Sequence, residues 1–270
     1  AALLYVLALG SPTQPIDRAA WRAWTDTHRA QWGDFQGYTL LNFGPLFGHQ
    51  YSAAWIDFRG IRDADMRARG SDYFENARKA TYTQRAYAIA NPNRWADYGD
   101  NVWGLTACDG PQGARLTVDG RERQFQGYLA RGAAAGYVAD DGTIAPTAVV
   151  GSIAFAPEIA IPALQTLHDR YGEHVYTRYG FLDAFNPTLR RADVAPQTGT
   201  LIPDFGWVGH DYIGIDQGPI LLMLENYRSG LVWEVMRSNR YLRRGLERAG
   251  FTGGWLHKPA RQMEARDSGR

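Results

Sequence analysis

Apolar residues recur along much of this chain at the spacing of an α-helix. Residues 2–9 are almost wholly apolar and end at a Gly-Ser-Pro turn, which predicts a buried helix. Residues 16–31 carry Trp21, Trp24 and His28 at positions i, i+3 and i+7, which gives the segment an aromatic face. Two helices are therefore expected before the first long loop.

Further helices are expected where periodic stretches are bounded by capping residues, Gly or Pro. The helix at residues 71–90 should be capped by Ser71 or Asp72 and should end at Asn91-Pro92. The other expected helices cover residues 57–69, 145–153, 157–170, 216–237 and 239–249, which brings the number to about eight.

Long loops at residues 32–52, 91–144 and 180–215 separate these helices. The middle loop is rich in glycine and is expected to hold a short β-ribbon formed by residues 115–118 and 123–127. Strand signals elsewhere are weak, so the fold class is mainly α, with consecutive helices stacked as hairpins. Loops of this length inside a compact domain are usually functional.

The segment at residues 215–233 combines apolar periodicity with polar groups. Apolar side chains recur every three or four residues from Ile220 to Leu231, and Glu225 and Arg228 interrupt them. Asp216 lies in the Asp-Gln-Gly-Pro turn that opens the segment. Asp216 could be a helix N-cap and Glu225 with Arg228 a structural ion pair. The alternative is a helix that presents polar groups to a sugar-binding cleft.

Composition narrows the function classes. The 270 residues can bury a full core in one domain, and 29 basic against 28 acidic residues give no electrostatic case for nucleic acid or an anionic membrane. Nine Trp, 15 Tyr and 11 Phe will mostly fill the core, but many lie in loops rich in Gly, Pro and Asp, which suits stacking against sugars. Cys108, the one cysteine, excludes an internal disulfide and is expected to be a buried filler.

The first residues do not form a targeting signal. Residues 2–9 lack a preceding basic region and are far too short to span a membrane, so neither a signal peptide nor a membrane span is expected. The chain begins with Ala1 rather than Met, and we expect the true N-terminus to lie upstream.

Loop motifs place an aromatic residue beside an acid or amide and a glycine, which is the composition of a carbohydrate cleft. These motifs lie at residues 42–60, 98–111 and 179–187. Together with residues 215–233, they supply the candidates for substrate binding: Phe47, His49, Gln50, Tyr51, Asp57, Arg59, Trp103, Asp109, Asp183, Asn186, Gln217 and Glu225.

Cleavage of a glycosidic bond requires a carboxylic acid and a carboxylate. Each loop acid could instead be a cap or turn residue, and His49 could be a loop hydrogen-bonding residue. No pair of histidines has metal-ligand spacing, so no metal is expected. The candidate acids are Asp57, Asp100, Asp109, Asp183, Asp204, Asp211 and Asp216.

These motifs together resemble the glycoamylase-like family that includes glycoside hydrolase family 144, the endo-β-1,2-glucanases. The chain is similar also to the related domain of cyclic β-1,2-glucan synthases. The matching stretches are residues 43–60, 98–111, 142–162, 179–186 and 212–233. The resemblance implies an (α/α)6 toroid with a sugar cleft at one end, and cofactor-free, inverting hydrolysis of β-glucan. It also implies a bacterial enzyme in the periplasm or secreted.

The resemblance assigns two catalytic carboxyls. Asp100 occupies the position where the family usually has the Glu that acts as general acid, which sets its carboxyl back by about 1.5 Å. A displacement of that size can cost on the order of 10²-fold in rate. Asp216 matches the acid of the family's Ile-Asp-Gln-Gly-Pro motif and is assigned as a cleft carboxylate and base.

The expected domain covers residues 1–256, with a polar tail at residues 257–270. Family members carry helices before the segment that matches residues 3–12, so the resemblance implies a toroid incomplete at its N-terminus. Two alternatives to a hydrolase are a transglycosylating domain of a cyclic glucan synthase and a non-catalytic glucan-binding remnant. The expected partner is an oligo- or polysaccharide, and the oligomeric state is open.

Overall fold

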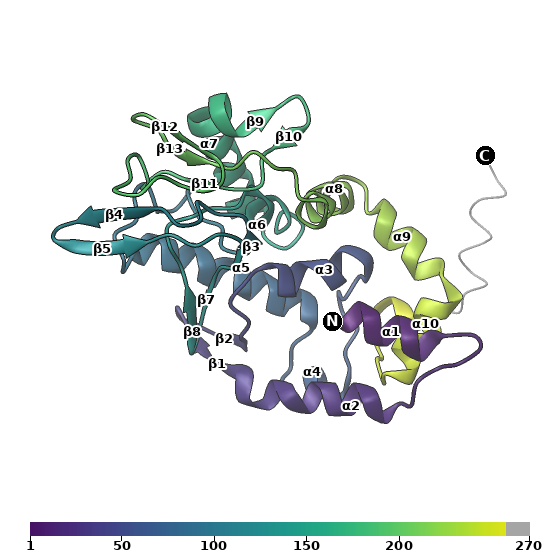
Figure 1. The fold of residues 1–270 in the computed structure, drawn as a ribbon. Coiled ribbons are helices and arrows are strands. Elements are labelled where there is room, and N and C mark those ends of the chain that lie inside the picture. Colours follow the sequence, from purple (N-terminus) through teal and green to yellow (C-terminus); the bar gives the residue numbers. More distant parts are fainter. Residues whose placement is uncertain (258–270) are drawn as a thin grey trace.

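The computed structural model describes residues 1–257, and the tail expected at residues 257–270 lies, from residue 258 onward, outside the described residues. Figure 1 shows the fold. The α-helices of the described part are α1 (Ala2–Gly10), α2 (Ala19–Asp26), α3 (Phe47–Trp55), α4 (Ala64–Ala68), α5 (Tyr73–Ala90), α6 (Pro146–Val150), α7 (Pro157–Val175), α8 (Gly214–Arg228), α9 (Leu231–Ser238) and α10 (Arg240–Arg248). Two 3₁₀ helices accompany them, η1 (Thr27–Gln31) and η2 (Gly254–His257).

The strands are short and pair antiparallel in small sheets, so the fold class is mainly α, as predicted. The hairpins are β1 (Trp32–Phe35) with β2 (Tyr38–Leu41), β4 (Arg115–Val118) with β5 (Arg121–Gln124), β7 (Gly132–Ala134) with β8 (Tyr137–Ala139), and β9 (Tyr176–Thr177) with β10 (Gly180–Phe181). β3 (Ala107–Cys108) pairs with β6 (Leu129–Ala130), and β13 (Gly206–Val208) lies between β11 (Phe185–Asn186) and β12 (Thr200–Ile202).

Local capping signals located several helices correctly. The expected helix at residues 71–90 forms as α5, and Asp72 rather than Ser71 caps it, because its carboxylate accepts a hydrogen bond from Glu75 N. Asn91 ends α5 in the left-handed conformation, as the Asn-Pro signal indicated. The helix expected at residues 16–31 forms as α2 continued by η1. The predicted ribbon forms as β4 and β5, with its second strand shifted toward the turn.

Several expectations are wrong. The loops expected at residues 91–144 and 180–215 hold further short strands besides the predicted ribbon, and three other segments differ. The expected loop at residues 32–52 holds the hairpin of β1 and β2 and most of α3. In the segment at residues 57–69, α4 begins only after Asp63, whose carboxylate accepts from Met66 N. The helix expected at residues 216–237 divides into α8 and α9 at Gly230, which has a φ of 74°. In the last two cases, a cap or turn inside the segment overrides its apolar periodicity.

The first and last α-helices of the described part, α1 and α10, pack unusually closely. Figure 1 shows α1 beside α10, and the two helices meet at Gly10 and Gly245. A Cβ atom at Gly10 would lie 2.0 Å from the backbone oxygen of Tyr241, and one at Gly245 would lie 2.0 Å from the backbone oxygen of Val6. Only glycine allows the two backbones to approach this closely.

Elsewhere, several helices leave large apolar side chains in solvent. Leu4 on α1 and Leu221 on α8 are each 70% exposed. The other such residues on these helices and on α9 are Leu7, Ile215, Leu224, Tyr227, Leu231 and Val235. None of the helices in residues 1–257 is both long and apolar enough to cross a membrane.

A fully buried ion pair fixes the loops on the strand-rich side of the molecule. Arg131 bonds Asp141 through Nε (2.7 Å) and Nη2 (2.8 Å). Its Nη1 donates to the backbone oxygens of Cys108 (2.9 Å) and Asp109 (3.3 Å), and its Nη2 to that of Gly127 (3.1 Å). One guanidinium therefore ties together the segments that follow β3 and precede β6.

The close contact between α1 and α10 predicts that one added methyl group will strongly lower the stability of the protein. Gly245→Ala should destabilise the protein by about 2 kcal/mol or more, because the new Cβ collides with backbone that cannot move without separating the helices. Gly218→Ala, inside α8, is the control, because a Cβ there meets no atom within 4 Å. It should be neutral or stabilising by up to about 1 kcal/mol. Urea unfolding measures both, and equal effects would contradict the assignment.

The buried ion pair predicts that replacing Arg131 costs far more stability than replacing an exposed arginine. Arg131→Met should destabilise by about 3–5 kcal/mol, because Asp141 is left buried without its cation. Arg29→Met removes the exposed pair with Asp26, whose side chains are 75% and 49% accessible, and should change stability by less than about 0.5 kcal/mol. Chemical denaturation of both variants tests the difference. A second substitution, Asp141→Asn, should restore part of the loss in Arg131→Met.

Candidate active site

Two buried aspartates from distant parts of the chain meet in the structure. Asp183 lies between β10 and β11, and Asp216 lies in the first turn of α8. They are 2% and 1% exposed, and their carboxyls share a hydrogen bond when one of them carries a proton. Sequence analysis named both residues, and the structure brings them into direct contact.

Three helices position Asp216. The N-cap of α8 is Ile213, which has no side-chain cap, so the alternative of Asp216 as N-cap is wrong. The Tyr51 hydroxyl on α3 donates to Asp216 Oδ1 at 3.1 Å, and the Thr147 hydroxyl on α6 donates to the Asp216 backbone oxygen at 2.6 Å. The N-terminal turn of α8 also favours negative charge at this position.

Backbone contacts hold Asp183 from two sides. Its own N–H donates to the backbone oxygen of Asp211 at 3.0 Å, and its Oδ2 accepts from the N–H of Asp109 at 2.7 Å. Asp109 follows β3, and the Arg131 guanidinium donates to its backbone oxygen. The Asp109 carboxylate turns back on its own chain and accepts from Gly110 N at 2.8 Å.

One oxygen on each carboxyl has no donor. Asp183 Oδ1 and Asp216 Oδ2 are buried, and no hydrogen bond from residues 1–257 reaches either atom. A buried polar atom without a partner is costly and usually marks a functional atom. A proton between the two carboxyls, or a hydroxyl group of a bound molecule, would satisfy these atoms.

Burial and mutual repulsion change the acidity of the pair. Burial, followed by the charges of Asp216 and Asp109, raises the pKa of Asp183 to about 7, although the hydrogen bond from Asp109 N opposes the shift. Burial also raises the pKa of Asp216, and hydrogen bonds from Tyr51 and Asp183 limit that rise. Burial and the charge of Asp216 raise the pKa of Tyr51, so its hydroxyl remains a donor.

Tyr128 is a further residue near the pair, and sequence analysis did not name it. It lies just before β6 with 58% of its surface exposed. Burial and then the charges of Asp216 and Asp183 raise its pKa, which places its hydroxyl within electrostatic reach of both carboxyls. The signal was present, because Tyr128 follows Gly127 in a glycine-rich loop, but the motif at residues 98–111 ends before it.

Other predicted binding residues lie in the core. Gln50 donates to the backbone oxygen of Ala148 and to Ser152 Oγ, both at 2.9 Å, and so joins α3 to α6. Asn186 is fully buried and bonds only protein groups in the described part. Trp103 is 1% exposed. The structure does not bring these three side chains to the paired carboxyls.

Asp57 and Arg59 form a separate structural network. Asp57 is 1% exposed and pairs with Arg59 at 2.8 Å and with Arg237. The Arg59 guanidinium lies 4.3 Å from the centre of the Trp233 ring, and Trp255 Nε1 donates to the Asp57 backbone oxygen at 2.8 Å. Asp57 is therefore occupied by cations of the protein and ties the C-terminal helices to the segment after α3.

Only the start of the segment at residues 215–233 borders the paired carboxyls. Glu225 pairs with Arg228 at 2.9 Å, so the structural ion pair is confirmed. Nine residues of helix place Glu225 about 14 Å along α8 from Asp216, which removes it from the carboxyl pair. Gln217 lies beside Asp216, and its Nε2 donates to the Phe181 backbone oxygen at 3.1 Å.

Asp100, the predicted general acid, and Cys108 lie in opposite environments. Asp100 is exposed on the segment after α5, and its backbone oxygen accepts from Arg85 Nε at 2.8 Å. Its catalytic role stays a prediction.

Cys108 is fully buried, and burial raises the pKa of its thiol to about 12, so the expectation of an inert filler is confirmed.

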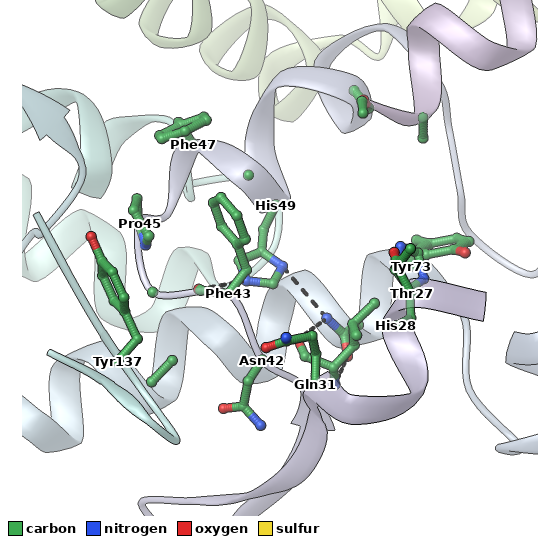
Figure 2. Close-up of a pocket in the computed structure, with 18 of the residues that line it drawn as sticks. Thr27, His28, Gln31, Asn42, Phe43, Pro45, Phe47, His49, Tyr73 and Tyr137 are labelled. Carbon is green, nitrogen blue, oxygen red and sulfur yellow. Dashed lines mark hydrogen bonds between the residues drawn. The ribbon is translucent and has the colours of Figure 1, made fainter. Parts of the chain in front are cut away.

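Phe47 and His49 line a different feature, a cavity of about 720 Å³ (Figure 2). Figure 2 shows Phe43, His49 and Tyr137 around it. His49 Nε2 bonds the Phe43 backbone oxygen at 3.2 Å, and burial lowers the pKa of His49 to about 4, so its ring is neutral at pH 7. The amide of Asn42 bonds backbone oxygens of the protein itself. No Asp or Glu of the described residues lines the cavity, so Asp183 and Asp216 lie outside it.

The cavity and the pair adjoin through α3. The Phe47 ring packs on the Tyr51 ring with their centres 5.1 Å apart, and Tyr51 bonds Asp216. Among residues 1–257, no cluster of three or more His, Cys, Asp or Glu side chains is arranged to hold a metal ion. The arrangement offers a buried acidic pair that is hydrogen-bonded by Tyr51 and lies within electrostatic reach of Tyr128. Such a pair can exchange protons with a bound molecule.

Comparison with known proteins gives a consistent group of relatives. An exo-β-1,2-glucooligosaccharide sophorohydrolase acting at the non-reducing end, from Parabacteroides distasonis, is 27% identical over 91% of this chain. The solved structure of an endo-β-1,2-glucanase from Chitinophaga pinensis, a complex with sophorotriose and glucose, is 31% identical over 94% of the chain, with a TM-score of 0.74. A solved structure described as a putative glucoamylase, from Bacteroides uniformis, is 34% identical over 94% of the chain, with a TM-score of 0.73.

These relatives are longer than the chain. It spans 32% of the Parabacteroides hydrolase and 54% of each of the two solved structures. A family model described as "Putative glucoamylase" matches residues 1–240. The chain therefore belongs to the glycoamylase family, as its loop motifs indicated.

Proposed function

We propose that this chain is a glycoside hydrolase that cleaves β-1,2-linked glucan. The observation that carries the proposal is the buried Asp183–Asp216 pair beside Tyr51 and Tyr128. The substrate class is supported by two relatives, one described as acting on β-1,2-glucooligosaccharides and one solved with sophorotriose and glucose. A neutral sugar also suits a chain whose net charge is +1.

The aspartate pair supplies one of the two carboxyl functions that the reaction needs. Catalytic carboxyls are about 5–5.5 Å apart in retaining glycosidases and about 6.5–9.5 Å apart in inverting ones. The hydrogen bond that Asp183 and Asp216 can share when one of them is protonated requires a shorter separation than either of these, so we infer that the pair does not flank a glycosidic bond from opposite sides. We assign the pair to the base side of an inverting reaction, in which Asp216 takes a proton from the attacking water.

The general acid must then come from another residue. Asp100 is the candidate from family resemblance, and its exposed carboxyl is free to reach a bound substrate. In this reaction, the acid protonates the leaving glycosidic oxygen while the hydroxide derived from water adds to the anomeric carbon. The exposed ring of Tyr128 offers a surface on which a sugar can stack beside the base.

We infer the finer architecture and the location in the same way. A complete (α/α)6 toroid, to which this chain contributes part of the ring, is supported by the TM-score of 0.74 against the Chitinophaga glucanase. Consecutive helices that contact each other, such as α6 with α7 and α8 with α9, are consistent with helical hairpins arranged around an axis. A site of action outside the cytoplasm, periplasmic or secreted, is supported by family resemblance.

Activity on linear β-1,2-glucan tests the proposal. The chain should release new reducing ends, and Asp216→Asn should lower the rate by about 10²- to 10⁴-fold, because the amide cannot accept a proton. Asp100→Asn should cause a comparable loss if Asp100 is the acid. Asp26→Asn removes an exposed carboxylate on α2 and is the control, which should keep the wild-type rate.

The products and the binding behaviour separate the alternatives. Inversion at the anomeric carbon, followed by NMR during the first turnovers, is expected. Cyclic products with retained configuration would instead identify a transglycosylating domain. If the chain binds the glucan but neither wild type nor variants release sugar, the chain is a glucan-binding module and the hydrolase proposal is wrong.

A further inference from the structure

We propose that Asp183 and Asp216 hold one proton between them, and that Asp183 is the positioning residue that keeps this proton so that Asp216 acts as a singly charged base. The physical claim concerns the pair itself and can be tested without substrate. Its catalytic consequence rests on the proposed hydrolase function.

The protein supplies a donor to one oxygen of each carboxyl. Asp183 Oδ2 accepts from Asp109 N at 2.7 Å, and Asp216 Oδ1 accepts from the Tyr51 hydroxyl at 3.1 Å. Asp183 Oδ1 and Asp216 Oδ2 receive nothing from the described residues. One proton placed between the carboxyls gives each of them a partner, whereas two ionised carboxylates in contact repel each other.

The surroundings offer no other way to neutralise the pair. The titratable groups that act on it are Tyr51 from α3, Tyr128 from the segment before β6, and Cys108 and Asp109 from the end of β3. None of these groups is a cation. The neighbouring cation Arg131 is already paired with Asp141. A proton is therefore the available counter-charge for two buried carboxyls.

The surroundings favour the proton on Asp183. Asp216 accepts from the Tyr51 hydroxyl and lies in the first turn of α8, where the helix dipole favours negative charge, so Asp216 is the carboxyl that stays ionised. Burial and the charge of Asp216 raise the pKa of Asp183 to about 7, whereas hydrogen bonds from Tyr51 and Asp183 favour the ionised form of Asp216. Because the pKa of Asp183 is raised in the folded state, its neutral form is favoured below pH 7. The stabilisation that it brings is complete below about pH 4 and is lost as the pH rises through about 7.

The arrangement gives Asp216 a defined role in the reaction. As a carboxylate, it accepts hydrogen bonds from the hydroxyls of Tyr51 and Asp183, which fix its orientation. When water attacks the sugar, Asp216 takes the proton of that water, and Asp183 keeps its own. Above about pH 7, Asp183 ionises, the two carboxylates repel, and Asp216 loses both a donor and its fixed position.

The direct test follows the protonation of the pair by infrared difference spectroscopy of the chain between about pH 5 and about pH 9. Wild type should show one carboxyl that titrates near pH 7. Asp183→Asn should lose that signal, because an amide keeps a donor toward Asp216 but does not ionise. Asp26→Asn, which changes charge equally on the surface, should keep the signal. If wild type has no such carboxyl, or if Asp183→Asn retains it, proton sharing is wrong.

The pH dependence of kcat/KM on linear β-1,2-glucan tests the catalytic consequence. Wild-type activity should fall about tenfold per pH unit above about pH 7, and this fall should disappear in Asp183→Asn. Asp183→Asn should stay within about tenfold of wild type at about pH 6, whereas Asp183→Leu, which has no donor, should be much less active at every pH. If Asp183→Asn keeps the wild-type profile, Asp183 does not position Asp216.

The two proposals fail in distinguishable ways. A carboxyl that titrates near pH 7 in a chain without hydrolytic activity supports the shared proton and overturns the hydrolase function. Activity that depends on Asp216, in a chain whose spectra hold no such carboxyl, supports the hydrolase and overturns the shared proton.

Discussion

Burying two carboxyl groups against each other is the constraint on which the rest of this structure depends. An unpaired buried charge costs several kcal/mol, so the protein must supply donors, a counter-charge or a proton. It supplies two donors from rigid positions, the Tyr51 hydroxyl on α3 and the Asp109 N–H after β3. Neither donor is near its acceptor in sequence. The fold must therefore hold α3, α8 and two loops in register before the pair can exist.

Arg131 and Asp141 show how that register is held. Their buried ion pair, with additional bonds from Arg131 to the backbone oxygens of Cys108 and Asp109, fixes the loop that presents Asp109 N to Asp183. The arginine charge is compensated by Asp141 rather than by the catalytic candidates. This separation matters, because a cation placed against Asp183 would stabilise its ionised form and remove its proton.

Sequence predicted the parts of this molecule whose signals are local. Asp72 and Asn91 bound α5 as expected, because a cap and a left-handed terminus act within one turn. The helix α3 was missed, because its buried face consists of Gln50, Ala53 and Ala54, whose periodicity is weak. The small sheets were missed as well, because strands of two or three residues are stabilised by tertiary packing rather than by their own pattern.

The residues of the candidate site could also be predicted only as far as local signals reach. Asp183, Asp216, Tyr51 and Asp109 could be named from loop composition, but their contact could not, because it joins segments up to 165 residues apart. Composition also could not distinguish residues that face a ligand from residues of the same type that face the protein. Asp57 has the same aromatic and glycine neighbours as the site residues, yet two arginines occupy its carboxylate.

In the proposed reaction, the rigidity of the pair has a consequence for Asp100, which we propose as the acid. Asp216 is fixed by Tyr51, by Asp183 and by the first turn of α8, so it cannot move to meet a substrate. The side chain of Asp100 is one methylene shorter than the Glu that the family usually has at this position. Any movement that closes this gap must then come from Asp100 or from the sugar. Asp100 is exposed and lies on a loop, where movement costs least. A fixed buried base and an adjustable exposed acid would allow the reaction geometry to be completed only when a glucan bridges them.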